Sequence, residues 1–268
     1  GVELDPAKEI QPLIGSKEGI LHVTLAFVNP GGAVLVPNPG YPTYTSLSNL
    51  LGARIVNYDM VEDNGWQPDF DQLESMDLTG VKLMWTNYPN MPTGGRAQRE
   101  TYERLVRFAR ERDIIVVNDN PYSFILNEGE KLSILQIPGA KDHCIEFNSM
   151  SKSHNMPGWR VGMLATNSEF ISWILKVKSN IDSGTFRALQ LAAAQAYANT
   201  EQWHTEANIA TYARRRAMAQ EIMDTLHCSY DPNQVGMFLW GRIPDSYADV
   251  EELTERVLHE ARVFITPG

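Results

Sequence analysis

A single lysine lies among serines in the stretch SMSKSHNMPGWRVG (residues 149–162), which also holds one arginine. An amine such as that of Lys152, partly desolvated beside another cation, can lose its proton near neutral pH and attack a carbonyl carbon. The guanidinium of Arg160 offers a planar fork of donors that suits a phosphate group, and Ser149 and Ser151 add hydroxyls. This pattern predicts a nucleophilic amine beside an anion site, with a solvated surface loop as the alternative.

A Gly-Ser turn in IGSKEGI (residues 14–20) opens an apolar, helix-like pattern. Free backbone N–H groups at a helix start suit an anion, phosphate above all. Ser16 and Lys17 are therefore candidate phosphate ligands. The alternative is an ordinary helix start in which Ser16 is the cap.

An aromatic ring and a carboxylate follow two strand-like runs. PNPGYPTY (37–44) holds Tyr41 on a stiff turn, where its ring could stack on a flat ligand or simply pack against the turn. In VVNDNPYSF (116–124), Asp119 ends a strand of buried type and Tyr122 follows it. A buried carboxylate is costly unless it meets a cation, such as a protonated ring nitrogen, or good donors. Capping of the next turn by Asp119 is the alternative.

The fold class follows from the alternation of strand-like and helix-like patterns, which predicts an α/β protein. The clearest helix is expected over 99–113, with an apolar face and a charged face. Most strand-like runs are apolar throughout, which is typical of a mostly parallel, mixed sheet covered by helices on both faces. These runs are 33–37, 53–58, 81–87, 114–119, 144–149 and 161–166. The candidate residues lie at the ends of such runs, where ligand sites of α/β sheets gather.

The pattern changes after Asn180, and we expect two regions: a large domain over 1–186 and an α+β region over 187–268. The second should contain helices over 185–198, 201–226 and 249–261, and strands over 235–243 and 263–266. Residues 1–10 read as the inside of a helix without a cap, and the chain stops soon after the strand-like run 263–266, so both ends of the chain are expected to be cut.

Composition limits the partners of this 268-residue chain. Its formal net charge of −10, without clustered Lys and Arg, argues against a nucleic-acid surface. No apolar run reaches membrane-spanning length. Cys144 and Cys228 have no metal or redox spacing, and the six histidines are scattered, so we expect a cytoplasmic protein without a metal site.

Together the candidate residues describe a ligand that is flat, aromatic, phosphorylated, carbonyl-bearing and basic at a ring nitrogen, which fits pyridoxal 5′-phosphate (PLP). At this point the sequence resembles the class I/II aminotransferases of the fold-type I PLP enzymes, nearest to the LL-diaminopimelate aminotransferase subgroup. The resemblance covers essentially the whole chain. The motifs that carry it are GSKEGI, PNPGYPTY, YPNMPTGG, DNPYSF, SMSKSHNMPGWRVG and VKSNIDSG.

The resemblance implies a role for each candidate. Lys152 would hold the cofactor covalently and carry a proton between the substrate α-carbon and the cofactor carbon C4′. Asp119 would keep the ring nitrogen protonated, Tyr122 would bond the 3′ oxygen, and Tyr41 would stack on the ring. The phosphate would be held by Ser16, Lys17, Ser149, Ser151 and Arg160. The segment 178–184 resembles one that approaches a neighbouring subunit's cofactor, so a homodimer is implied.

Two features depart from the family pattern. The family places an asparagine before Pro-Thr-Gly to bond the 3′ oxygen, whereas this chain has Met91, which cannot donate that bond. We therefore expect an altered cofactor affinity or titration, unless Tyr122 suffices alone. Family members are also longer at both ends, where parts of the substrate site lie.

The reaction implied is ping-pong transfer of an amino group between an amino acid and a 2-oxo acid. Two alternatives stay open at this point. One is a PLP-dependent β-lyase that cleaves a carbon–sulfur bond, because a shared fold does not determine the reaction. The other is a sensor domain without catalytic activity.

Overall fold

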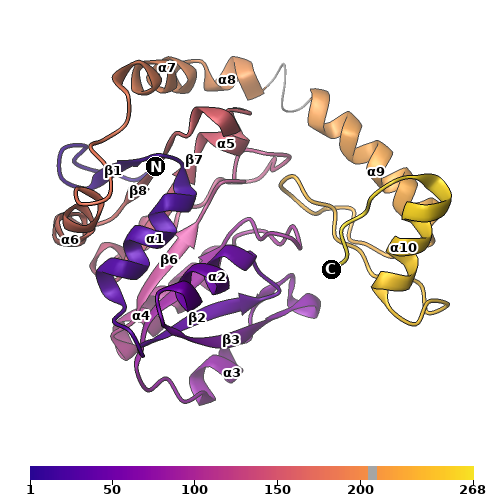
Figure 1. Ribbon diagram of the computed structural model, residues 1–268, viewed down its shortest axis with the longest axis horizontal. Helices are drawn as coiled ribbons and strands as arrows, with labels where there is room; N and C mark the ends of the chain where they lie inside the picture. Colours follow the sequence, from indigo (N-terminus) through magenta and orange to yellow (C-terminus); the bar gives the residue numbers. More distant parts are fainter. Residues whose placement is uncertain (205–209) are drawn as a thin grey trace.

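A mixed eight-stranded sheet forms the body of the protein in the computed structural model, which describes residues 1–204 and 210–268 (Figure 1). The strand order is β1-β8-β7-β6-β5-β2-β3-β4. Strands β3, β2, β5, β6 and β7 run parallel, whereas β8 is antiparallel to both of its neighbours and β4 is antiparallel to β3. The strands are β1 Ile10–Leu13, β2 Ala33–Asn38, β3 Arg54–Val61, β4 Gln67–Pro68, β5 Val81–Asn87, β6 Ile115–Asp119, β7 Cys144–Ser149 and β8 Gly162–Ala165.

Ten α-helices are described, and several of them cover the two faces of the sheet. In Figure 1, α7 and α8 lie along the end of the body that carries α5, and α9 and α10 lie to one side. The helices are α1 Ser16–Phe27, α2 Pro42–Leu50, α3 Phe70–Ser75, α4 Arg99–Arg112, α5 Met150–Ser153, α6 Ser168–Lys178, α7 Arg187–Ala198, α8 Thr200–Trp203, α9 Ala213–Thr225 and α10 Val250–Ala261. Short 3₁₀ helices span Glu62–Asn64, Ile134–Gln136, Ala140–Asp142 and Pro157–Trp159. None of the helices in these described parts is long and apolar enough to cross a membrane.

Alternate residues of the central strands enter two separate cores, as expected for a sheet that is buried on both faces. In β2, Val34 and Val36 pack in the core that includes residues of α1 and α6. Ala33 and Leu35 pack on the opposite face with residues of α3 and α4. The expected α/β architecture is therefore confirmed, as are the six predicted strands and the helices over 99–113 and 249–261, within a few residues at their ends.

The helix expected over residues 1–10 is wrong. The Asp5 carbonyl and carboxylate hold a single turn, accepting from the backbone N–H groups of Lys8, Glu9 and Ala7. The chain then straightens into β1, which pairs with the edge of β8. Pairing in the sheet decides the conformation here.

The strands expected over 235–243 and 263–266 are also absent, although these residues are described. Within them only Arg242 makes an isolated bridge, with Ser229. In 235–243, side chains bond backbone groups that pairing with another strand would need. Arg216 donates to the carbonyls of residues 234, 236 and 238. The Gln234 side-chain amide donates to the Trp240 carbonyl and accepts from the Trp240 N–H. The helix expected over 201–226 is seen as the end of α8 and as α9, and its residues 205–209 lie outside the described part. The domain boundary at 186/187 stays a prediction.

Candidate active site

A cavity of about 330 Å³ opens where β2, β5, β6 and β7 end. Parallel strands present their carboxyl ends at one edge of a sheet: β5, β6 and β7 each end in a lining residue, and Tyr41 follows the end of β2. All nine residues predicted from the sequence line this one cavity: Ser16, Lys17, Tyr41, Asp119, Tyr122, Ser149, Ser151, Lys152 and Arg160. The structure therefore brings the whole predicted set together.

The carboxyl group of Asp119 lies buried at the end of β6. Its Oδ2 accepts a hydrogen bond of 2.9 Å from the Tyr44 hydroxyl, and its Oδ1 is buried with no hydrogen-bond partner among the described residues. Burial raises the pKa of Asp119 to about 6, and the Tyr44 bond opposes that rise. Asp119 does not cap the following turn, so the alternative that the sequence left open is wrong. Its free oxygen suits a cationic N–H donor.

The turn before α1 forms an anion cradle together with Arg160. Gly15, not Ser16, is the N-cap, with φ 76° and ψ 154°, a region that only glycine populates readily. A Cβ at Gly15 would lie 2.0 Å from Nη2 of Arg160, so the guanidinium covers the turn closely. Nη1 of Arg160 lies 3.4 Å from the Ser151 hydroxyl. The first N–H groups of α1 have no partners within the helix and add to these donors.

Lys152 sits on the short helix α5, which starts where β7 ends. The Ser149 side chain caps this helix by accepting from the Ser151 N–H at 3.2 Å, and Met150 anchors it in the interior. Lys152 is half-buried, and its amine makes no hydrogen bond or ion pair within residues 1–204 and 210–268. The amine is thus held at the cavity wall and stays available for a ligand.

Aromatic rings form another wall of the cavity. Tyr41 lies at the end of the turn that joins β2 to α2. Its ring lies edge-on to that of Tyr44, which stacks on Trp85 with centroids 4.9 Å apart. The buried ring of Tyr122 meets Phe238 edge-on at 5.8 Å. Burial raises the pKa of Tyr122, so its hydroxyl stays protonated at neutral pH.

Several lining residues were not predicted as site residues: Ile20, Tyr44, Asn87, Met91, Pro121, Pro157 and Phe238. Tyr44 follows Tyr41 by one helical turn, and Asn87 ends an apolar strand, so both had a signal in the sequence. Phe238 comes from a loop far along the chain, and no local pattern points to it. Met91 is part of the cavity lining, and its backbone N–H donates to Asn87 Oδ1 at 2.7 Å.

A buried carboxylate, an amine and an anion cradle around one cavity, at the strand ends of an α/β sheet, define a PLP-dependent enzyme of fold type I. The family model described as aminotransferase class I and II matches residues 1–268. The chain belongs to the class I and II aminotransferase family and is a PLP-dependent transferase of amino groups.

Relatives and solved structures agree with this assignment. The chain is 40% identical to LL-diaminopimelate aminotransferases of Dehalococcoides mccartyi and Aquifex aeolicus, across all of this chain and 69% of each relative. BacF from Bacillus subtilis superposes with a TM-score of 0.92 at 31% identity, over 100% of this chain and 68% of BacF. An aspartate aminotransferase from Thermus thermophilus superposes with a TM-score of 0.89 at 27% identity, over 100% of this chain and 69% of that enzyme.

The residues of the cavity fit PLP. The orphaned buried oxygen of Asp119 matches a protonated pyridine nitrogen, and the donors around Gly15 match a phosphate. Lys152 offers a free amine to the aldehyde. Among the described lining residues Asp119 is the only carboxylate, against three cations, so the lining suits a dianion.

Asp119→Asn should remove a pH-dependent contribution to the free energy of unfolding of the cofactor-free protein. Because the folded-state pKa is raised to about 6, the stabilisation linked to Asp119 is present at low pH and is lost as the pH rises through about 6. The free energy of unfolding of the variant, relative to that of the wild type, should therefore increase by roughly 2 kcal/mol between pH 4.5 and pH 7.5. Urea unfolding at both pH values measures this gain, and parallel profiles would contradict it.

Gly15→Ala should weaken cofactor binding at least tenfold, because the new methyl group would collide with the Arg160 guanidinium. Gly31→Ala is the matched control, since Gly31 also has a positive φ of 84° but a methyl group added there would meet no described atom within 4 Å. Each variant should lose about 1–3 kcal/mol of stability from backbone strain. Titration with PLP and thermal unfolding separate the two effects, and equal affinity losses would count against the cradle.

Proposed function

We propose that the nine predicted residues carry out PLP-dependent transamination at this cavity. The observation that supports the proposal is the meeting of the free Lys152 amine, the buried Asp119 carboxylate and the Arg160 cradle around one space. When bound, PLP supplies an aldehyde for covalent attachment and a ring that accepts electrons. The protein's part is to bind, orient and move protons.

Each residue contributes a distinct step. The amine of Lys152 would hold the cofactor covalently, and the same amine, once free, would take the proton from the substrate α-carbon and deliver it to the cofactor carbon C4′. Asp119 holds a proton at the ring nitrogen, because its buried carboxylate is stabilised by a cation there. The Tyr122 hydroxyl would donate to the 3′ oxygen, and Tyr41 would pack on the ring face.

The phosphate is held by side chains and by the helix start. Arg160 binds it through its guanidinium, Ser149 and Ser151 add hydroxyls, and Ser16 and Lys17 add the donors at the start of α1.

The substrates are an amino acid and a 2-oxo acid. Relatives that are 40% identical over the whole chain are named LL-diaminopimelate aminotransferases, and LL-diaminopimelate is therefore the amino donor to test first.

A homodimer is the proposed assembly, as is general for the family. Large apolar side chains are exposed along 181–191, among them Phe186 at 72% and Leu191 at 60%. A surface of this kind is typical of an interface between subunits.

A cytoplasmic location is supported by the two cysteines, which form no disulfide.

Lys152→Ala should abolish covalent attachment of the cofactor. Wild-type protein incubated with PLP and then reduced with borohydride should carry a pyridoxyl group on the peptide that contains Lys152, as found by mass spectrometry. Lys17→Ala is the control, because Lys17 is also a cavity amine but should leave the adduct in place. An adduct on any other lysine would refute the role of Lys152.

The same preparation distinguishes transfer from lysis. Incubation with an amino donor and no acceptor should give one equivalent of oxo acid per subunit, with the cofactor recovered as pyridoxamine 5′-phosphate. Continuous release of ammonia and oxo acid from a cysteine conjugate would instead favour the β-lyase.

Met91→Asn should tighten PLP binding up to about tenfold, or shift the pH midpoint of the cofactor absorbance, because asparagine can donate to the 3′ oxygen. Met91→Leu is the control, since it keeps the volume and adds no donor. Unchanged affinity and midpoint in the asparagine variant would show that Tyr122 suffices at this position.

A further inference from the structure

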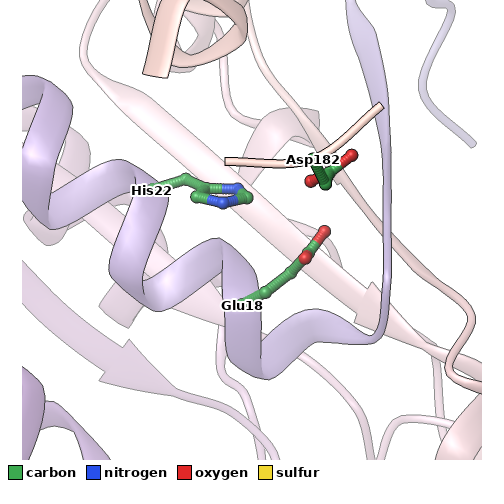
Figure 2. A group of neighbouring side chains, drawn as sticks. All are labelled: Glu18, His22 and Asp182. Atoms are coloured by element: carbon green, nitrogen blue, oxygen red, sulfur yellow. The ribbon is translucent and has the colours of Figure 1, made fainter. Parts of the chain in front are cut away.

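A buried lysine lies behind the anion cradle, on the side away from the cavity lining. Lys178, at the end of α6, is 4% exposed, and its amine donates to Glu18 Oε1 at 2.9 Å and to Asp182 Oδ2 at 2.6 Å. His22 completes the cluster from the next turn of α1; Figure 2 shows its ring beside the carboxylates of Glu18 and Asp182.

Glu18, His22 and Asp182 have the spacing of a metal site, with ligand atoms within 4.8 Å of one another. The Lys178 ammonium, however, already pairs with both carboxylates, so a divalent ion would have to displace a buried cation. Burial alone would lower the pKa of Lys178, but its bonds to Asp182 and Glu18 raise it above the ordinary value. Burial lowers the pKa of His22, which disfavours its protonated form. The cluster is therefore built around an ammonium ion.

The cluster reaches the cradle through one atom. Glu18 Oε1, which receives Lys178, also accepts the backbone N–H of Ile14 at 2.6 Å. On the other side of the same turn, the Ile14 carbonyl faces Nη2 of Arg160 at 3.5 Å. The turn that presents Gly15 is thus held from both sides, by a carboxylate behind it and by a guanidinium in front.

We infer that Lys178 is a positioning residue for the cofactor phosphate, acting through Glu18 on the Ile14–Gly15 turn. The inference rests on the proposed phosphate site. Glu18 lies in the first turn of α1, where its charge would repel a nearby phosphate if it were not neutralised. Lys178 neutralises that charge and holds Oε1 where it can accept the Ile14 N–H.

Removal of Lys178 would leave two partly buried carboxylates close together without a cation. Such a pair is unfavourable, so Glu18 would turn toward solvent or take up a proton. Either change weakens the Ile14 bond and loosens the turn. Phosphate binding should suffer, whereas binding of the pyridine ring, which depends on other lining residues, should not.

The experiment compares pyridoxamine 5′-phosphate with pyridoxamine by equilibrium dialysis. The two ligands differ only in the phosphate, and neither has an aldehyde that could react with Lys152. Lys178→Met should weaken binding of pyridoxamine 5′-phosphate about tenfold and that of pyridoxamine less than twofold. Lys141→Met is the control: it breaks an ion pair of similar length but greater exposure, to Glu9 at 2.8 Å, and should leave the ratio of the two affinities unchanged.

The double variant Glu18→Gln/Lys178→Met gives a second test if the single variant does not fold. The glutamine oxygen can accept the Ile14 N–H without a counter-charge, so the ratio should return to within about threefold of the wild type. An unchanged ratio in Lys178→Met, or a failure of the folded double variant to recover it, would overturn the inference. A wild type that does not distinguish the two ligands would overturn the proposed phosphate site as well.

Discussion

The arrangement of the site depends on the burial of one carboxylate. Asp119 ends the central strand β6, and its position in the register places it beside Asn87 of β5 and Phe147 of β7. The Tyr44 hydroxyl satisfies one of its oxygens, and Tyr44 is in turn fixed by its stack on Trp85. The other oxygen is buried and has no hydrogen-bond partner among the described residues. Such an atom destabilises the cofactor-free protein, and a cationic ligand relieves that cost, so stability and ligand binding are coupled.

The same strand register organises the neighbouring loop. The Asn87 amide donates to the Asp119 carbonyl at 2.6 Å, and its oxygen accepts the N–H of Met91. The loop that carries Met91, a residue of the cavity lining, is thereby attached to the strand that carries Asp119. The main chain around Met91 is thus held by Asn87 whatever side chain stands at position 91.

Much of this site could be predicted from the sequence, because local signals coincide with structural positions. Asp119 and Ser149 end strand-like runs, Lys152 follows the second run by three residues, and strands buried on both faces deliver such residues to one edge. The prediction of a strand over 235–243 was wrong because side chains bond the backbone there. Arg216 lies in a different helix, and Gln234 lies across the loop from Trp240. Phe238 reaches the cavity from that loop, and the Lys178–Glu18 contact joins residues 160 positions apart. Pairings of this kind arise from tertiary structure and have no local pattern.

The charge of the cavity lining is opposite in sign to the net charge of the chain. The protein carries a formal net charge of −10, yet Lys17, Lys152 and Arg160 line the cavity, where Asp119 is the single carboxylate among the described lining residues. The acid closest to the cradle along the chain, Glu18, is turned away and neutralised by Lys178. A local positive potential within an acidic surface attracts a phosphate, and it also favours the carboxylates that amino acids and oxo acids share. The paired charges behind the cradle therefore preserve the field in front of it, and this links a buried ion pair to ligand selection at the cavity.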